Sequence, residues 1–222
     1  MGRLFLIFSI LTFSAGVFAA GSAGGTGGGM PTGGVVQTPE QIAASLYKSG
    51  LKHKKRAWKN EERAATALAA ENEKKYQKYL KRAQKEYVKA MNDHGSALKV
   101  FPQHYEAANE LGYALRKTGD YRKAIGAYNY ALGIKPDFLQ AIEYRGEAFL
   151  AIGLIDEAKQ SYMILFRADP ELAQQLMTAM DTWLTEQSEQ TESVAELAAW
   201  VEERKNLANI SQDLSQNTAR QW

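Results

Sequence analysis

The 222-residue chain contains no cysteine, only five prolines and only three histidines. Without cysteine, disulfide bonds, a cysteine nucleophile and a lipid-modified N-terminal cysteine are excluded, so the folded core must be stabilised by packing alone. His53, His94 and His104 lack the spacing of a zinc-binding motif, and we expect no metal site. No nucleophile-elbow, phosphate-binding or dinucleotide-binding glycine motif is present either. The sequence therefore predicts neither an enzyme nor a bound cofactor.

Charge is nearly absent from residues 1–37, where Arg3 is the only charged side chain. After it, Leu4 to Phe18 form an almost purely apolar run of about 15 residues, shorter than the roughly 20 that a membrane-spanning helix needs. Small residues follow, which predicts a cleaved signal peptide over residues 1–19 and a periplasmic or secreted protein without a lipid anchor. A permanent membrane anchor is the alternative. Residues 20–37 are glycine-rich and poor in apolar side chains, so we expect a flexible linker.

Charges elsewhere are unevenly distributed, although the formal net charge is only +2. Residues 43–99 carry 15 Lys and Arg against 6 Asp and Glu, whereas residues 169–222 carry 3 against 10. The basic residues of segment 48–59 surround Trp58, a combination that binds anionic lipid or another polyanion. One hypothesis is therefore an envelope-surface binding protein, with nucleic acid an unexpected ligand for an exported protein. The alternative is a solvated helix surface with Trp58 in the core.

Helix signals begin at Thr38-Pro39-Glu40-Gln41, where a hydroxyl cap, a proline at the first helical position and a glutamine three residues after the cap coincide. We expect this helix to end near Gly50. From Leu51 no glycine or proline occurs before Gly95, and strong helix formers dominate. Two interpretations stay open: residues 71–104 form a degenerate helix-pair repeat, or one continuous helix runs from residue 51 to residue 91.

Residues 105–138 recur as residues 139–172, with a period of 34 residues. The first copy reads Leu111-Gly112…Gly119-Asp120-Tyr121…Ala124…Tyr128…Pro136, and the second reads Arg145-Gly146…Gly153-Leu154-Ile155…Ala158…Tyr162…Pro170. This pattern resembles the tetratricopeptide repeat family, here as an exported bacterial member. The resemblance implies an all-α fold in which helix-turn-helix repeats stack into a solenoid. The repeats would follow a helical extension (residues 38–104) and precede C-terminal capping helices and a tail (residues 173–222).

Several residues at equivalent places in the two copies have a predicted packing role. Glycine inside a helix is costly, so Gly112 and Gly146 indicate that two helix backbones approach closely there. Gly119 and Gly153 permit the turn inside each helix pair, and a proline ends each second helix. The remaining packing positions are Ala124, Tyr128, Pro136, Ala158, Tyr162 and Pro170. After the repeats, the spacing predicts capping helices over residues 171–186 and 192 to about 208.

The resemblance also implies a function, a scaffold or adaptor that binds a protein or peptide in the cell envelope. In the proteins this sequence resembles, the first helix of each repeat lines a concave groove that receives peptides. The candidate groove residues are Glu106, Asn109, Tyr113, Arg116, Lys117, Gln140, Glu143 and Glu147. The alternative is a solvated helix face without a ligand. If the groove hypothesis holds, replacing Tyr113 and Glu147 by alanine should weaken partner capture without lowering the melting temperature.

The sequence leaves two further alternatives open. The protein could act as a weakly specific periplasmic chaperone rather than a dedicated adaptor. Only two repeats are clear, and three or more are usual for independent stability, so the flanking helices either complete the core or pair with a second copy in a homodimer.

Overall fold

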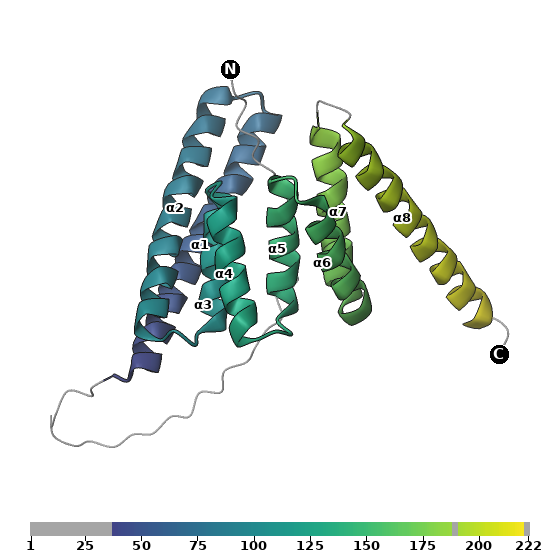
Figure 1. Cartoon of the computed structure of the whole chain (residues 1–222). Helices are drawn as coiled ribbons and strands as arrows, with labels where there is room; N and C mark the ends of the chain where they lie inside the picture. Colours follow the sequence, from purple (N-terminus) through teal and green to yellow (C-terminus); the bar gives the residue numbers. More distant parts are fainter. Residues whose placement is uncertain (1–36, 188–190, 220–222) are drawn as a thin grey trace, which may run out of the picture.

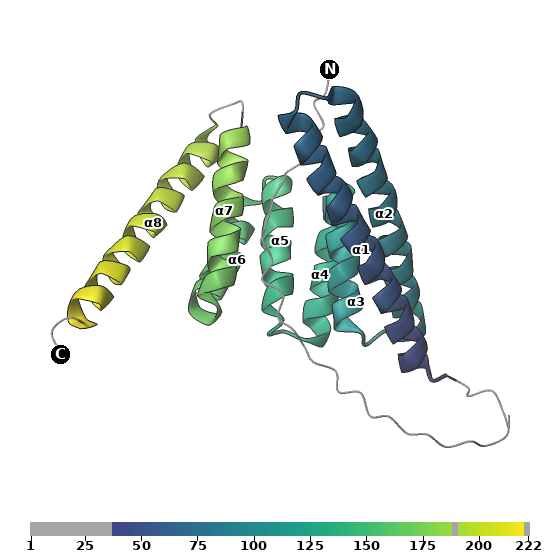
Figure 2. The same ribbon diagram turned by 180° about the vertical axis from the view of Figure 1, so that it is seen from behind.

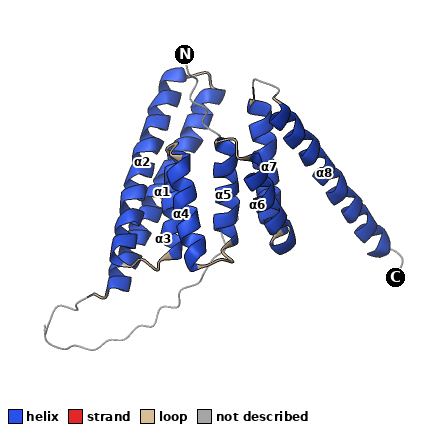
Figure 3. Cartoon of the chain, in the orientation of Figure 1, coloured by secondary structure: helices blue, strands red, loops and turns tan. Residues whose placement is uncertain are grey.

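The computed structural model describes residues 37–187 and 191–219 (Figure 1). The predicted signal peptide and nearly all of the predicted linker lie outside these residues. Within the described ranges every regular element is an α-helix (Figure 3). The helices are α1 (Pro39–Ala69), α2 (Glu73–Val100), α3 (Tyr105–Lys117), α4 (Tyr121–Ile134), α5 (Leu139–Ala151), α6 (Ile155–Ala168), α7 (Pro170–Glu186) and α8 (Glu192–Ala219).

Helices α3–α4 and α5–α6 form two pairs of identical length and spacing. Each start and each end in the second pair falls 34 residues after its counterpart in the first pair. The chain turns within each pair at Gly119 (φ 87°) and Gly153 (φ 75°), and only glycine adopts this left-handed conformation without strain. The predicted all-α fold of helix-turn-helix pairs, with an N-terminal extension and C-terminal capping helices, is confirmed.

The helix pairs stack side by side along the chain, as the two opposite views in Figures 1 and 2 show. Each helix packs against the next one in sequence, and the first helices of neighbouring pairs also touch: α1 with α3, α3 with α5, and α5 with α7. This arrangement is typical of solenoids, in which each repeat is covered only by its neighbours. Any surface made by the first helices is therefore shared by α1, α3, α5 and α7.

The helix that begins at Pro39 does not end at Gly50, so this expectation was wrong. Its start has the predicted capping box, in which the Gln41 N–H donates to the Thr38 hydroxyl (3.3 Å) and the Thr38 N–H donates to the Gln41 side chain (3.0 Å). At Gly50 the ring of His94 on α2 packs directly on the backbone, and an added Cβ atom would lie 2.4 Å from His94 Cε1. Gly50 makes room for a ring and does not stop the helix.

Residues 71–104 do not form a helix pair, which corrects the interpretation of a degenerate repeat. They contain the single helix α2, which passes through Lys85 without a turn because the segment offers strong helix formers and no glycine there. The alternative of one helix over residues 51–91 was also wrong, since the chain reverses at residues 70–72. Glu71 has a φ of 51°, and the Asn72 side chain caps α2 by accepting from the Lys75 N–H (3.0 Å).

The C-terminal end consists of α7 and α8. Asp169 caps α7 by accepting from the N–H groups of Glu171 (3.0 Å) and Leu172 (3.1 Å). Helix α8 continues to Ala219, beyond the end expected near residue 208. It packs on α7 with buried Val194, Leu197 and Val201, and then diverges from α7 (Figures 1 and 2). Within the described ranges, no helix is both long and apolar enough to cross a bilayer.

Candidate functional site

The eight candidate groove residues do not form an open face. Asn109, Tyr113, Glu143 and Glu147 are buried, and the other four, Glu106, Arg116, Lys117 and Gln140, are partly exposed. The alternative, a solvated helix face, therefore does not describe half of the set. Their predicted role, contact with a peptide, is not tested by this placement and stays a prediction.

Helix α1 covers one side of this set with polar side chains. Lys54 Nζ donates to both carboxylate oxygens of Glu110 (2.9 and 2.7 Å) and lies 4.0 Å from the centroid of the Tyr113 ring. Trp58 Nε1 donates to the Tyr113 hydroxyl (2.7 Å), and Lys117 Nζ pairs with Glu61 (2.8 Å). Lys54 and Trp58, which the sequence placed in a basic binding segment, thus link α1 to α3.

Burial has electrostatic consequences for this link. It lowers the pKa of Lys54, and the neighbouring Glu110 carboxylate opposes that effect. A buried ammonium group in contact with a carboxylate and an aromatic ring has replaced its water ligands with protein groups. The contact is therefore a structural junction.

A second polar contact joins α3 to α5. Arg116 forms an ion pair with Glu147, and Gln140 Nε2 donates to Glu143 Oε2 (3.0 Å). Glu143 is fully buried, and its Oε1 has no hydrogen-bond partner among the described residues. Burial, reinforced by the charge of Glu147, raises the pKa of Glu143 well above its usual value. Burial and the charge of Glu147 thus both favour the neutral form of Glu143 beside the Arg116–Glu147 pair.

These contacts together form what we call the polar junction. Its nine residues are Lys54, Trp58, Glu61, Glu110, Tyr113, Arg116, Lys117, Glu143 and Glu147. The groove residues predicted from the sequence include Tyr113, Arg116, Lys117, Glu143 and Glu147 of this set but not Glu110 or Glu61, and Lys54 and Trp58 were assigned to a separate basic segment. The 34-residue period relates α3 to α5, whereas α1 lies outside the period and no spacing rule connects residue 54 to residue 110.

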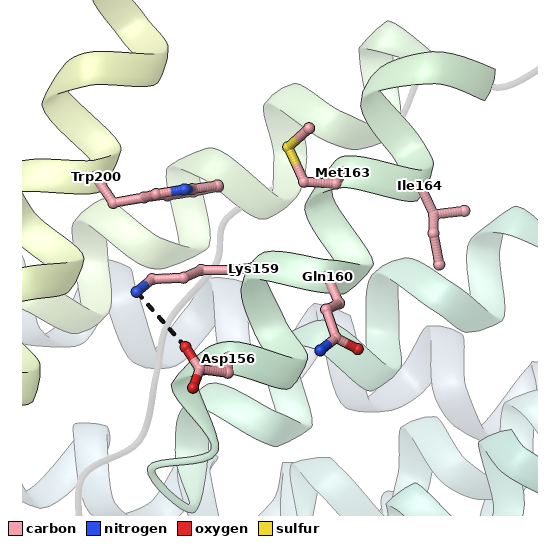
Figure 4. A pocket seen from close by; sticks show the side chains of 6 residues that line it. All are labelled: Asp156, Lys159, Gln160, Met163, Ile164 and Trp200. Carbon is pink, nitrogen blue, oxygen red and sulfur yellow. Dashed lines mark ion pairs between the residues drawn. The ribbon is translucent and has the colours of Figure 1, made fainter.

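A different surface is open, between α6 and α8. A pocket of about 550 Å³ is lined by Asp156, Lys159, Gln160, Met163 and Ile164 of α6 and by Trp200 of α8. Figure 4 shows Trp200 reaching from α8 toward Lys159 and Met163, with Lys159 pairing with Asp156 at 3.7 Å. The pocket thus lies between α6 and the helix α8, which diverges from α7 (Figures 1 and 2). We call it the α6–α8 pocket.

An aromatic row extends the apolar character of this pocket along α6. The ring of Tyr162 meets the ring of Trp200 edge-on (5.2 Å between centroids) and stacks on Phe166 (5.9 Å). Ile164 and Phe166 are 45% and 51% exposed, which is high for large apolar side chains. The sequence predicted a capping helix over residues 192 to about 208, which contains Trp200, but it indicated neither Ile164 nor Phe166 as a surface residue.

Among the residues that the structure describes, no group of three or more acidic or histidine side chains could hold a metal ion. His53 Nδ1 instead lies 2.7 Å from Glu86, and His104 Nδ1 lies 3.0 Å from Glu106. Both histidines take part in contacts within the protein.

Comparison with known proteins does not name a family. No protein-family model matches the chain, and no curated protein matches it. Among solved structures, the chain is similar to the TPR domain of Sgt2 from Aspergillus fumigatus, at 17% identity over 69% of this chain and 81% of that chain, with a TM-score of 0.36. A similarity of this size shows neither family membership nor function. The class is set by the chain itself, an all-α protein of stacked helix pairs.

Proposed function

We propose that this protein is a scaffold that binds a protein or peptide partner in the cell envelope after export. Stacked helix pairs provide extended surfaces, and the sequence offers no acid, base or nucleophile arranged for catalysis. The observation that carries the proposal is the α6–α8 pocket, together with the exposed apolar side chains of Ile164 and Phe166 on α6. Export rests on the signal-peptide pattern of residues 1–19 alone.

The chemistry of the pocket suits a partner segment with a large apolar side chain. Trp200, Met163 and Ile164 offer apolar contact, whereas Asp156, Lys159 and Gln160 supply polar groups around it. Aromatic residues and methionine are enriched in protein interfaces, and polar rims surround apolar centres there. Exposed apolar side chains that gather on one face of a water-soluble domain mark interaction sites. The pocket is thus a better supported contact surface than the largely buried groove residues.

The test is in-cell crosslinking of the tagged protein followed by mass spectrometry. Ile164→Ser removes an apolar side chain from the pocket, and Ile42→Ser removes one of similar exposure from the start of α1. We expect one envelope protein to crosslink to the wild type and to Ile42→Ser. Its yield should fall about fivefold with Ile164→Ser, equivalent to about 1 kcal/mol of binding energy.

Both variants should melt within about 2 °C of the wild type, because both side chains are exposed. Undiminished crosslinking of the same protein to Ile164→Ser would contradict the proposed contact surface. A broad set of unrelated proteins, reduced equally by both variants, would indicate a chaperone of low specificity instead.

A further inference from the structure

The α1–α2 hairpin exposes a surface of almost uniform charge. Among residues 39–100, fourteen Lys and Arg side chains are exposed, against four exposed acidic ones. The basic ones are Lys48, Lys52, Lys55, Arg56, Lys59, Arg63, Lys74, Lys75, Lys78, Lys81, Arg82, Lys85, Lys89 and Lys99. The acidic ones are Glu40, Glu62, Glu71 and Glu73. We call the fourteen basic residues the basic face.

Helical spacing explains how the basic face forms. On α1, Lys48, Lys52, Lys55 and Lys59 recur every three or four residues, which places them on one side of the helix, opposite the buried alanines. The lysines of α2 follow the same rule. Of the fourteen, only Lys89 forms an ion pair with another described residue, Glu86 (2.6 Å). The protein therefore leaves nearly all of this charge unneutralised.

One end of the hairpin projects beyond the neighbouring helices. Figure 1 shows the α1–α2 turn lying past the upper ends of α4 and α5. From residue 60 to residue 82 only Ala64 and Ala67 are buried, so this tip packs on little besides its own partner helix. The tip also carries an apolar side chain, Leu68, which is 52% exposed. Two half-exposed tyrosines, Tyr76 and Tyr79, follow on α2.

The lysines, tyrosines and exposed leucine of the tip are suited to the interface between water and a lipid bilayer. Tyrosine has an apolar ring and a polar end, and lysine has an apolar stem and a charged end, so both residues favour the headgroup region of a bilayer. An exposed leucine at a projecting tip adds a group that reaches the acyl boundary. Lysines beside an anionic bilayer strengthen binding about fivefold each.

A second copy of the chain is the other candidate occupant, because its C-terminal end is acidic. Among the α8 side chains that the structure describes, the exposed acidic ones are Glu192, Glu196, Glu202 and Glu203. Four carboxylates would neutralise a small part of fourteen basic side chains, whereas a lipid surface supplies as many anionic groups as the hairpin can reach. A nucleic acid would match the charge and offers no apolar layer for Leu68.

We propose that the basic face and the tip of the α1–α2 hairpin bind a bilayer containing anionic phospholipids. Figure 2 shows the hairpin at the opposite end of the molecule from α8, which lines the α6–α8 pocket together with α6. A bilayer-bound hairpin would thus leave the pocket accessible to a protein partner. The inference itself does not depend on the pocket.

The test is co-sedimentation of the purified protein with phosphatidylcholine vesicles that contain or lack 30% phosphatidylglycerol. It compares the wild type with Lys74→Gln/Lys75→Gln/Lys78→Gln, and with Arg122→Gln/Lys123→Gln/Arg167→Gln as a control. The control removes the same charge from exposed positions on α4 and α6. Leu68→Ser is the fourth protein. All four share residues 1–37, so a difference between them reports the hairpin.

We expect binding at 50 mM salt that requires phosphatidylglycerol and weakens strongly at 0.3 M salt. The hairpin triple variant should bind at least tenfold more weakly, the control triple variant within twofold of the wild type, and Leu68→Ser severalfold more weakly. No phosphatidylglycerol-dependent binding at low salt would overturn the proposal, and so would an equal loss in both triple variants. Self-association or oligonucleotide binding that depends on these lysines, without vesicle binding, would also overturn it.

Discussion

The two ends of the solenoid are stabilised by different kinds of contact. In α5–α8 most of the large, fully buried side chains are apolar, among them Leu150, Leu165, Leu176 and Met180, although Glu143 on α5 is fully buried as well. Where α1 and α2 meet α3, the buried apolar residues are mostly alanines, such as Ala43, Ala57 and Ala97. The space beside these alanines is filled by polar groups, including Lys54 and His94.

The difference concerns what fixes the position of each helix. Large apolar side chains remove much surface from water and supply most of the stabilising free energy. Alanines let two helices approach closely but bury little surface each, so hydrogen bonds and ion pairs must set the register between the hairpin and the repeats. The N-terminal half should therefore respond to changes in charge and pH, and the C-terminal half to changes in side-chain volume.

The largest expected effect comes from breaking the polar junction at Arg116. Arg116→Met leaves Glu147 buried without its cation, next to Glu143, and removal of one partner of a buried pair costs about 3–5 kcal/mol. Urea unfolding measures the loss. The control, Lys123→Met, breaks an exposed pair with Asp120 (2.6 Å) and should cost less than about 1 kcal/mol.

A matched double variant sharpens this test. Arg116→Met combined with Glu147→Met replaces both charges by apolar groups of similar size, which should recover much of the lost stability. Equal stability of wild type and Arg116→Met would show that the pair does not hold α3 to α5.

The corresponding change in the apolar half is Leu176→Ala. Leu176 is fully buried on α7, and a Cβ atom at Gly146 of α5 would lie 2.7 Å from its Cδ2. The truncation should cost about 2–5 kcal/mol, depending on how far the site collapses. Measured at pH 7.5 and at pH 6, the cost should be the same, because no charged group is involved. If the cost of Leu176→Ala changes with pH, the proposed difference between the apolar and the polar half is contradicted.

The fold of the repeats could be predicted from the sequence because its signals are local. The 34-residue period, the glycines at positions 119 and 153 and the capping box at Thr38 each determine structure within a few residues. The hairpin was harder to predict, since the place of Gly50 inside a helix depends on a distant neighbour. Gly50 lies in mid-helix because the His94 ring needs its space, which is a tertiary contact.

The candidate groove shows more clearly which features could not be predicted from the sequence. Periodicity identifies which residues share a helix face, but whether another helix covers that face depends on contacts between residues more than 50 positions apart, such as Lys54 and Glu110. The expectation that alanine at positions 113 and 147 leaves stability unchanged needs revision. Tyr113 packs on the rings of Tyr87 and Tyr144, so its loss should destabilise the fold and obscure any effect on binding.

A smaller effect is expected where α1 and α2 are in closest contact. Gly50→Ala would place a Cβ atom within 2.8 Å of three His94 ring atoms, and such overpacking costs about 1–3 kcal/mol. Gly126→Ala on α4 is the matched control, because nothing lies within 4 Å of its Cβ position. Alanine should stabilise that helix by up to about 1 kcal/mol. If both changes shift the urea midpoint in the same direction, the hairpin is not tightly packed at His94.

The last effect concerns pH and separates the two halves without a change in volume. Burial, with smaller contributions from Lys54 and His104, lowers the pKa of His94 from 6.5 to about 3. Neither ring nitrogen has a hydrogen-bond partner among the described residues, while the Tyr47 ring packs 5.5 Å away. Below pH 6.5 the unfolded chain therefore binds a proton at His94 that the folded protein does not bind. The free energy of unfolding is thus highest above pH 6.5 and decreases below it.

Between pH 7.5 and pH 6 this residue should account for a loss of about 1 kcal/mol, approaching a slope of about 1.4 kcal/mol per pH unit at lower pH. Urea unfolding of the wild type and of His94→Leu over this range isolates the effect. The difference between their unfolding free energies should shift in favour of His94→Leu as the pH falls. Parallel curves would mean that His94 accepts its proton in the folded state, through contacts that the polar half can rearrange at little cost.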